Sequence, residues 1–202
     1  MPARTGRSCR WPLLRRIDPD RPVTLFAHSM GARVALAALH HLPEGAVDRA
    51  LLLSAAVFRD AAAAAMDSPA GRGLQLVNVT SRENDLFDIS TELLLGAGLR
   101  QTVSHGLRRP RANWLDLQLD HPGTLDGLDR LGFRLDRRQA RICHWSPYLR
   151  PGVFALWQAI LAGRTGLDDL RAVLPARAEP RGARLLPGLR LAPGRETGMM
   201  AP

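Results

Sequence analysis

A short apolar run passes directly into a helix-forming segment at Pro22-Val23-Thr24-Leu25-Phe26-Ala27-His28-Ser29-Met30-Gly31-Ala32-Arg33-Val34-Ala35-Leu36-Ala37-Ala38-Leu39. The run over 22–27 has the length and side chains of a buried strand, whereas 32–39 is rich in alanine and leucine, which favour a helix. Only a few residues, Ser29 among them, separate the two. The sequence therefore predicts a sharp strand-to-helix turn at Ser29.

The alternation of strands and helices continues along the chain. Further strands are predicted at 50–54, 74–79 and 114–120, and helices at 59–66, 89–95, 124–131 and 153–161. The last strand alternates apolar and polar residues, so we expect it to be half exposed and near an edge of the sheet. This order predicts an α/β fold with a mostly parallel sheet flanked by helices.

The two ends of the chain differ from the middle in composition. We expect residues 22–163 to form the domain, with 1–21 as a basic segment in which 13–18 resembles the end of a helix. Residues 164–202 are rich in Arg, Pro and Gly and lose all periodicity from about Ala172, so a disordered tail is predicted there.

The net charge of +9 over 202 residues raises the possibility of a nucleic-acid partner. All basic residues are Arg, and the segments 1–21 and 171–202 together supply +8 of that charge. The middle is almost neutral and has no aromatic residues interleaved with basic ones, so nucleic-acid binding through the ends is only a third interpretation. No apolar run reaches about 18 residues, so no membrane span is predicted.

The chain contains two cysteines, Cys9 and Cys143, which lie far apart and in no redox or metal-binding spacing. The first residues lack the apolar segment of a secretory signal. We therefore expect a cytoplasmic protein without a disulfide framework. No pair of histidines has metal-ligand spacing, so neither a metal nor a cofactor is expected.

The pentapeptide Ala27-His28-Ser29-Met30-Gly31 resembles the G-x-S-x-G nucleophile elbow of the α/β-hydrolase superfamily, with Ala27 in place of the first glycine. Such a turn holds the serine in a strained conformation and lifts its hydroxyl clear of the sheet. Small residues two positions on either side would let the strand and the helix approach closely. The resemblance implies that Ser29 is a nucleophile and that the N–H of Met30 stabilises an oxyanion. A serine that merely caps the helix is the alternative.

In this superfamily the acid and then the base follow the serine along the chain. Asp85 lies just past the third predicted strand, where the acid of the family commonly occurs, and Glu83 and Asp88 are competitors on the same loop. The resemblance therefore implies a Ser29–Asp85–His pairing that activates the serine.

Two histidines can serve as the base. His144 precedes Pro151 and the helix predicted at 153–161, as the histidine of the family precedes a proline and a final helix, and we favour it. His121 directly follows the fourth strand and remains the alternative. His28, next to the nucleophile, is expected to be a packing residue or an oxyanion-loop residue rather than the base. His40, His41 and His105 are expected on the surface.

The resemblance covers about residues 12–163 and corresponds only to the later part of the superfamily fold, in which four strands and a helix precede the elbow strand. Those N-terminal strands, and with them the second oxyanion donor, have no counterpart in the sequence. Loss of such a donor costs roughly 2.7–4 kcal/mol. We expect residues 121–141 to form the rim of the site.

Two interpretations follow. The first is a serine hydrolase that cleaves an ester or thioester through an acyl-enzyme, with Ser29, Asp85 and His144 as its triad and a small molecule as its substrate. The second is a non-catalytic, truncated α/β-hydrolase remnant that could self-associate through an exposed sheet edge.

Overall fold

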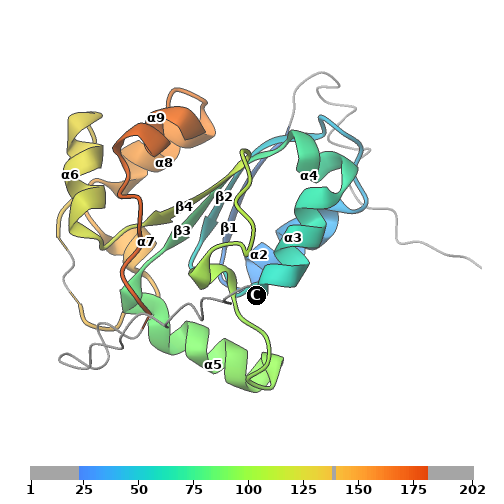
Figure 1. Cartoon of the computed structure of the whole chain (residues 1–202). Helices are drawn as coiled ribbons and strands as arrows, with labels where there is room; N and C mark the ends of the chain where they lie inside the picture. Colours follow the sequence, from blue (N-terminus) through green and yellow to red (C-terminus); the bar gives the residue numbers. More distant parts are fainter. Residues whose placement is uncertain (1–22, 138–139, 182–202) are drawn as a thin grey trace, which may run out of the picture.

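The computed structural model describes residues 23–137 and 140–181. Its centre is a parallel sheet in which strands β1 (Val23–His28), β2 (Val47–Leu53), β3 (Gln75–Thr80) and β4 (Trp114–Gln118) lie side by side in chain order (Figure 1). Helices flank the sheet on both faces. The expected α/β fold with a parallel sheet is thus confirmed.

The helices form two layers, one on each face of the sheet (Figure 1). Helices α2 (Gly31–Leu39), α3 (Arg59–Asp67) and α4 (Pro69–Gly73) cover one face, and α6 (Pro122–Arg130), α8 (Val153–Leu161) and α9 (Leu167–Val173) cover the other. Within β2, Ala50 and Leu52 pack in the first core and Leu51 and Leu53 in the second. This double burial explains why β2 is a continuous apolar run in the sequence.

Strand β4 ends the described sheet on one side and has the predicted alternation. Leu115 and Leu117 pack towards α6, α8 and α9, whereas Asp116 and Gln118 extend from the opposite face. The prediction of an edge strand is therefore confirmed for the residues that the structure describes.

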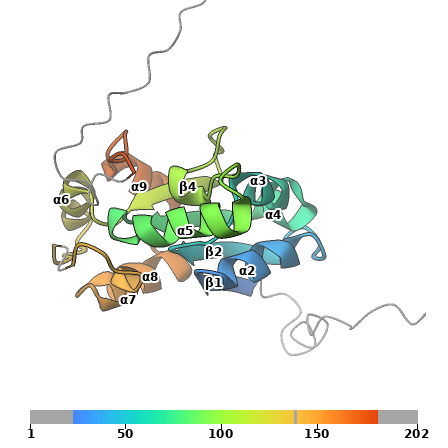
Figure 2. The same ribbon diagram turned by 90° about the horizontal axis from the view of Figure 1, so that it is seen from below.

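A further helix, α5 (Asp85–Gly96), lies beneath the sheet in Figure 1 and crosses in front of it in Figure 2. It follows β3 through a 3₁₀ turn, η1 (Arg82–Asn84), and begins four residues before the predicted start at Ile89. It ends as predicted at Gly96, because Ala97 adopts a left-handed conformation with φ of +50°. A second 3₁₀ turn, η2 (Val103–His105), leads towards β4.

The prediction of disorder from residue 164 onwards is wrong for 164–181. Leu167 and Leu170 of α9 are buried against the second core, and Glu179 donates its backbone N–H to the Gln118 side chain at 2.7 Å. Two well-placed leucines and a few hydrogen bonds thus order a segment whose composition suggested a tail. The predicted helix end at 13–18 and the residues after 181 lie outside the described part.

Short α7 (Ser146–Leu149) precedes α8 and contacts it. Among the described residues, no helix combines the length and the apolar character needed to cross a membrane.

Candidate active site

Ser29 lies directly between β1 and α2 and has a φ of +52°. Its backbone N–H donates to Leu53 O at 3.0 Å, and its carbonyl accepts from the N–H groups of Ala32 and Ala56, both at 3.1 Å. A left-handed conformation costs a residue with a side chain roughly 1–2 kcal/mol, and these bonds hold it in place. The predicted sharp turn at Ser29 is therefore present.

The residues around Ser29 leave one backbone donor free. Met30 is the N-cap of α2, and within the described residues its N–H has no hydrogen-bond acceptor. A free N–H at a helix N-terminus can stabilise an anion.

A small residue at Gly31 was expected to let the strand and the helix approach closely. This reason is wrong, because a Cβ at Gly31 would meet no neighbouring atom within 4 Å.

Ser29 and His144 line the same cavity, which has a volume of about 290 Å³. It lies where β1 and β2 end and where α5 begins its course beneath the sheet. Its lining residues are Ser29, Met30, Ser54, Ala56, Asn84, Phe87, Asp88, Ser90, Thr91, Leu94, Leu95 and His144. The rim is formed by α5, and no described residue of 121–141 takes part, so that expectation is wrong: the 121–141 segment leads into and out of α6, on the far face of the sheet.

The His144 ring is oriented by an amide. Its Nδ1 lies 2.6 Å from Oδ1 of Asn84, and because Oδ1 can only accept, Nδ1 carries the proton. The other ring nitrogen, Nε2, is therefore unprotonated in the neutral ring and can take a proton. Burial lowers the pKa of His144, and the neighbouring His28 lowers it further. The ring thus remains a neutral base at neutral pH.

His28 supports His144 from the other side. Its Nε2 donates to the His144 carbonyl oxygen at 3.2 Å, and its ring stacks on Trp145 with a centroid distance of 4.8 Å. The two imidazole centroids are 4.5 Å apart. Burial lowers the pKa of His28 as well. The expected packing role of His28 matches this placement.

The structure does not bring Asp85 to His144. The Asp85 side chain is fully buried, with Oδ1 lying 3.2 Å from Arg82 Nη1 and 3.7 Å from Arg181 Nε. It does not line the cavity that Ser29 and His144 share. The acid of a triad must be hydrogen-bonded to the imidazole, and Asp85 is not placed to do this. The residue just before it, Asn84, is the one bonded to the imidazole.

The two competing carboxylates have different surroundings. Glu83 is buried and pairs with Arg150 at 2.7 Å, which gives it a structural role. Asp88 lines the cavity beside Asn84 and accepts a hydrogen bond from the Asn84 side chain. Burial raises the pKa of Asp88 to about 7, although Arg181 opposes this rise. Asn84 therefore links a carboxyl group to the imidazole.

The alternative base, His121, caps a helix instead. Its Nδ1 accepts the N–H of Gly123 at 3.0 Å and so fixes the start of α6. His105 is exposed, as expected, and its Nε2 lies 2.6 Å from Arg181 Nη1 and 3.6 Å from Glu92 Oε1. No group of three His, Cys, Asp or Glu residues in the described chain is arranged to hold a metal ion.

Sequence reasoning missed Asn84 and Ser54. Ser54 follows β2 as Ser29 follows β1, with a φ of +45°, and its buried hydroxyl has no hydrogen-bond partner in the described structure. The signal for Ser54 was its place at the end of an apolar run. The sequence contains no signal for Asn84 other than its position next to Asp85. Asp85 was predicted as the partner instead, because carboxylates are the commoner partners of histidine.

The arrangement offers a serine, a neutral imidazole with one free nitrogen and a free N–H in one cavity, which are the groups that acyl transfer requires. Comparison of the chain with protein-family models, with curated proteins and with solved structures found no match.

Proposed function

We propose that the chain is a serine hydrolase of the α/β-hydrolase type that cleaves an ester or thioester of a small molecule through an acyl-enzyme. The observation that carries the proposal is Ser29 itself. It is held at positive φ at the end of a parallel strand, and it lines one cavity with His144. Strain of this kind is concentrated at functional sites, and ligands of parallel α/β sheets bind at the carboxyl ends of the strands.

In the proposed reaction, Ser29 Oγ attacks the carbonyl carbon of the substrate while Nε2 of His144 takes the hydroxyl proton. The resulting oxyanion accepts a hydrogen bond from the Met30 N–H. The tetrahedral intermediate collapses, the alcohol or thiol leaves with the proton from His144, and an acyl-serine remains. Water then attacks the acyl-serine, His144 again takes a proton, and the acid leaves as Ser29 is restored.

Asn84 replaces the expected Asp85 as the residue that orients the base. Its amide oxygen fixes the tautomer of His144, as a carboxylate would, but adds no negative charge to stabilise the imidazolium. When Asp88 is ionised, it supplies a negative charge through Asn84 rather than by direct contact with His144, because it accepts a hydrogen bond from Asn84. The proposed catalytic group is thus Ser29–His144–Asn84, with Asp88 as a positioning residue.

The walls of the cavity favour an apolar acyl group. Met30, Phe87 and Leu94 line it, and each has at least 40% of its surface exposed. Apolar walls at an open site gain free energy when they bury an aliphatic or aromatic group. This supports an ester or thioester with an uncharged acyl part.

The test is the intact mass of the purified chain after treatment with a fluorophosphonate probe. We expect a single adduct on the native chain, none on Ser29→Ala and at least a tenfold slower reaction on His144→Gln. Ser90→Ala is the matched control, because Ser90 lines the same cavity but its hydroxyl donates to Leu86 O at 2.8 Å. An adduct that persists in a folded Ser29→Ala variant refutes the proposal.

The second candidate is the non-catalytic remnant, favoured by the absence of a hydrogen bond between Ser29 and His144 among the described residues. Exposed apolar side chains along β1 and α7–α8 also favour it: Phe26, Leu149 and Phe154 are 43%, 68% and 54% exposed. On this view the chain gives no adduct although circular dichroism shows it folded, and it self-associates in sedimentation experiments.

A further inference from the structure

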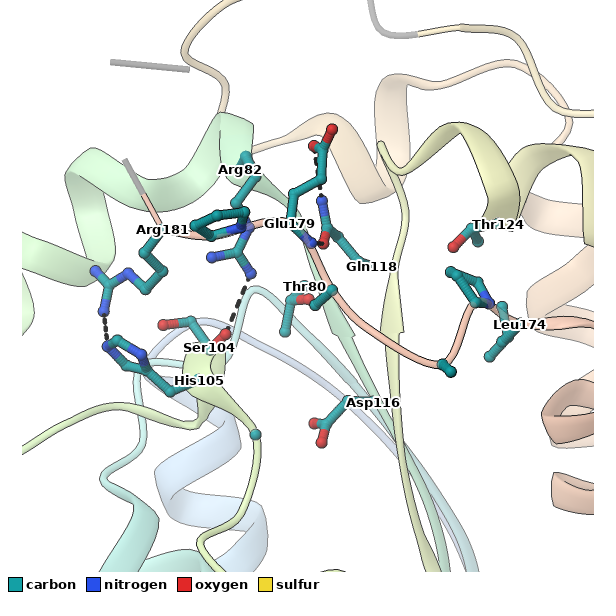
Figure 3. A pocket seen from close by; sticks show the side chains of 15 residues that line it. Thr80, Arg82, Ser104, His105, Asp116, Gln118, Thr124, Leu174, Glu179 and Arg181 are labelled. Carbon is teal, nitrogen blue, oxygen red and sulfur yellow. Dashed lines mark hydrogen bonds between the residues drawn. The ribbon is translucent and has the colours of Figure 1, made fainter. Parts of the chain in front are cut away.

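A second cavity, of about 350 Å³, lies away from Ser29 where β3 and β4 end. Figure 3 shows it from close by: Thr80 and Gln118 come from the two strands, His105 from η2 and Arg181 from the end of the described chain. The segment 174–180 adds a wall that is mainly Pro, Ala and Leu. Its volume is at the lower end of the range of small-molecule sites.

Asp116 offers an unused hydrogen-bond acceptor in this cavity. Its Oδ1 accepts from Asn78 Nδ2 at 2.8 Å and from Trp114 Nε1 at 2.9 Å. Oδ2 has no hydrogen bond from any described residue. The side chain remains accessible, and Figure 3 shows its carboxyl group between β4 and the η2 turn. The carboxylate is therefore oriented by two bonds while one oxygen is left for a ligand.

Gly106 keeps that oxygen uncovered. A Cβ at this position would lie 2.6 Å from Asp116 Oδ2, and the φ of Gly106 is +71°, which favours glycine. Any other residue here would either close off the carboxylate or displace it. The turn after η2 thus leaves open the place from which a donor can approach Oδ2.

The cations around the cavity are already paired. Arg82 lies 3.2 Å from Asp85, and Arg181 lies 2.7 Å from Glu92. Within the described chain, Asp116 forms no ion pair; Arg59 acts on it only as a more distant charge. A carboxylate without an ion-pair partner favours binding of a cation.

His105 adds no positive charge at neutral pH. Its Nε2 lies 2.6 Å from Nη1 of Arg181 and accepts from it, because a guanidinium can only donate. Burial, followed by the charge of Arg181, lowers the pKa of His105 to about 4. The cavity therefore contains no protonated imidazole that would repel a cationic ligand.

We propose that this cavity binds a small molecule with a primary ammonium group, which donates to Asp116 Oδ2 while its apolar part lies against the 174–180 wall. The site does not depend on the proposed hydrolase activity. An ammonium ion has three donors and no acceptor, so it matches a carboxylate oxygen reached from one side. Burial raises the pKa of Asp116, and an adjacent cation is expected to reverse that rise.

The test is NMR titration of the full ¹⁵N-labelled chain with butylammonium and with butanol, which has the same shape but no charge. The Trp114 indole N–H is the reporter, because it donates to Asp116 Oδ1. We expect saturable shifts of this resonance and of the Gly106 amide with butylammonium, and at least tenfold weaker binding of butanol. Equal binding of both compounds, or no shift with either, overturns the proposal.

Two variants sharpen the test. Asp116→Asn keeps the shape but removes the charge, and we expect it to bind butylammonium at least tenfold more weakly. Asp168→Asn removes an exposed carboxylate that pairs with Arg171 on α9, and binding should be unchanged. If Asp116→Asn does not fold, the native chain is tested instead by a pH titration followed through the carboxyl ¹³C shift of Asp116. The midpoint of this titration must move to lower pH with butylammonium, and an unmoved midpoint refutes the site.

Discussion

Asn84 Oδ1 lies 2.6 Å from His144 Nδ1, so an amide orients the imidazole although a carboxylate is the next residue in the chain. The neighbouring Asp85 points elsewhere because two arginines, Arg82 and Arg181, pair with it in the interior. The residue that orients His144 is therefore one position earlier in the chain than the expected acid, Asp85.

Exchange of the amide for a carboxylate tests this relationship directly. In Asn84→Asp a negative charge would lie beside His144, and we expect the pKa of His144 to rise by about 1–3 units. In Asn84→Ala the ring loses its partner, and labelling of Ser29 should slow at least tenfold. NMR titration of the His144 ring proton measures the first effect. An unchanged pKa in a folded Asn84→Asp chain would mean that the ring is not held by residue 84.

The pH dependence of Ser29 labelling follows from the burial of His144. Labelling needs the neutral ring, and burial lowers the pKa of His144 below its ordinary 6.5. We therefore expect the rate to hold as the pH falls to 6.5 and to decline only below that value. Probe adducts quantified by mass at fixed times from pH 5 to pH 8 provide the measurement. A midpoint above pH 6.5 would contradict the assignment of His144 as the base.

Asp88 is expected to make stability fall as the pH rises. Its carboxyl titrates near 3.8 when unfolded and at about 7 when folded, so between these values the folded chain binds the extra proton. Ionisation of the buried group then costs on the order of 1–4 kcal/mol above pH 7. We expect Asp88→Asn to unfold at a higher urea concentration than the native chain at pH 8, with a smaller difference at pH 4. The opposite trend would show that Arg181 determines the charge of Asp88.

Replacement of Ser54 by glycine is expected to stabilise the chain. The change relieves a φ of +45° and removes a buried hydroxyl without a partner, so we expect a gain of about 1–3 kcal/mol. Ala97→Gly is the matched control, since Ala97 has a φ of +50° but no hydroxyl, and it should gain about 1 kcal/mol. Thermal unfolding measures the gain in stability of each variant. Ala97→Gly reports the relief of backbone strain alone, and Ser54→Gly reports that relief together with removal of the unpartnered hydroxyl. A loss of stability in Ser54→Gly would assign the hydroxyl a structural partner.

The strands and most helices were predictable because their signals are local. Buried parallel strands such as β2 are apolar throughout, and the helix at 153–161 has the predicted bounds. The start of α5 was missed because its first turn contains two carboxylates, Asp85 and Asp88, which are buried there through contacts with residues such as the distant Arg181.

The site was predictable only in part for a related reason. Ser29 is recognisable because the strand, the turn and the helix that position it are consecutive. The partner of His144 depends on which of two adjacent side chains points into the cavity. Asp85 is held away by Arg82, three residues earlier, and by Arg181, which is far away in the sequence. Order in 164–181 likewise depends on contacts of Leu170 and Glu179 with other elements, which composition does not reveal.

The coincidence of chain order and sheet order bears on how the protein forms during synthesis. Each strand from β2 to β4 pairs with the one made just before it, so the sheet can grow as the chain leaves the ribosome. The face of the sheet that bears Leu51 and Leu53, however, is covered by helices that are synthesised late. These two residues pack with α8, which is translated about a hundred residues after β2. Until then the part of that face that α8 covers is exposed, and a nascent chain stalled before α8 would be a natural target for chaperones.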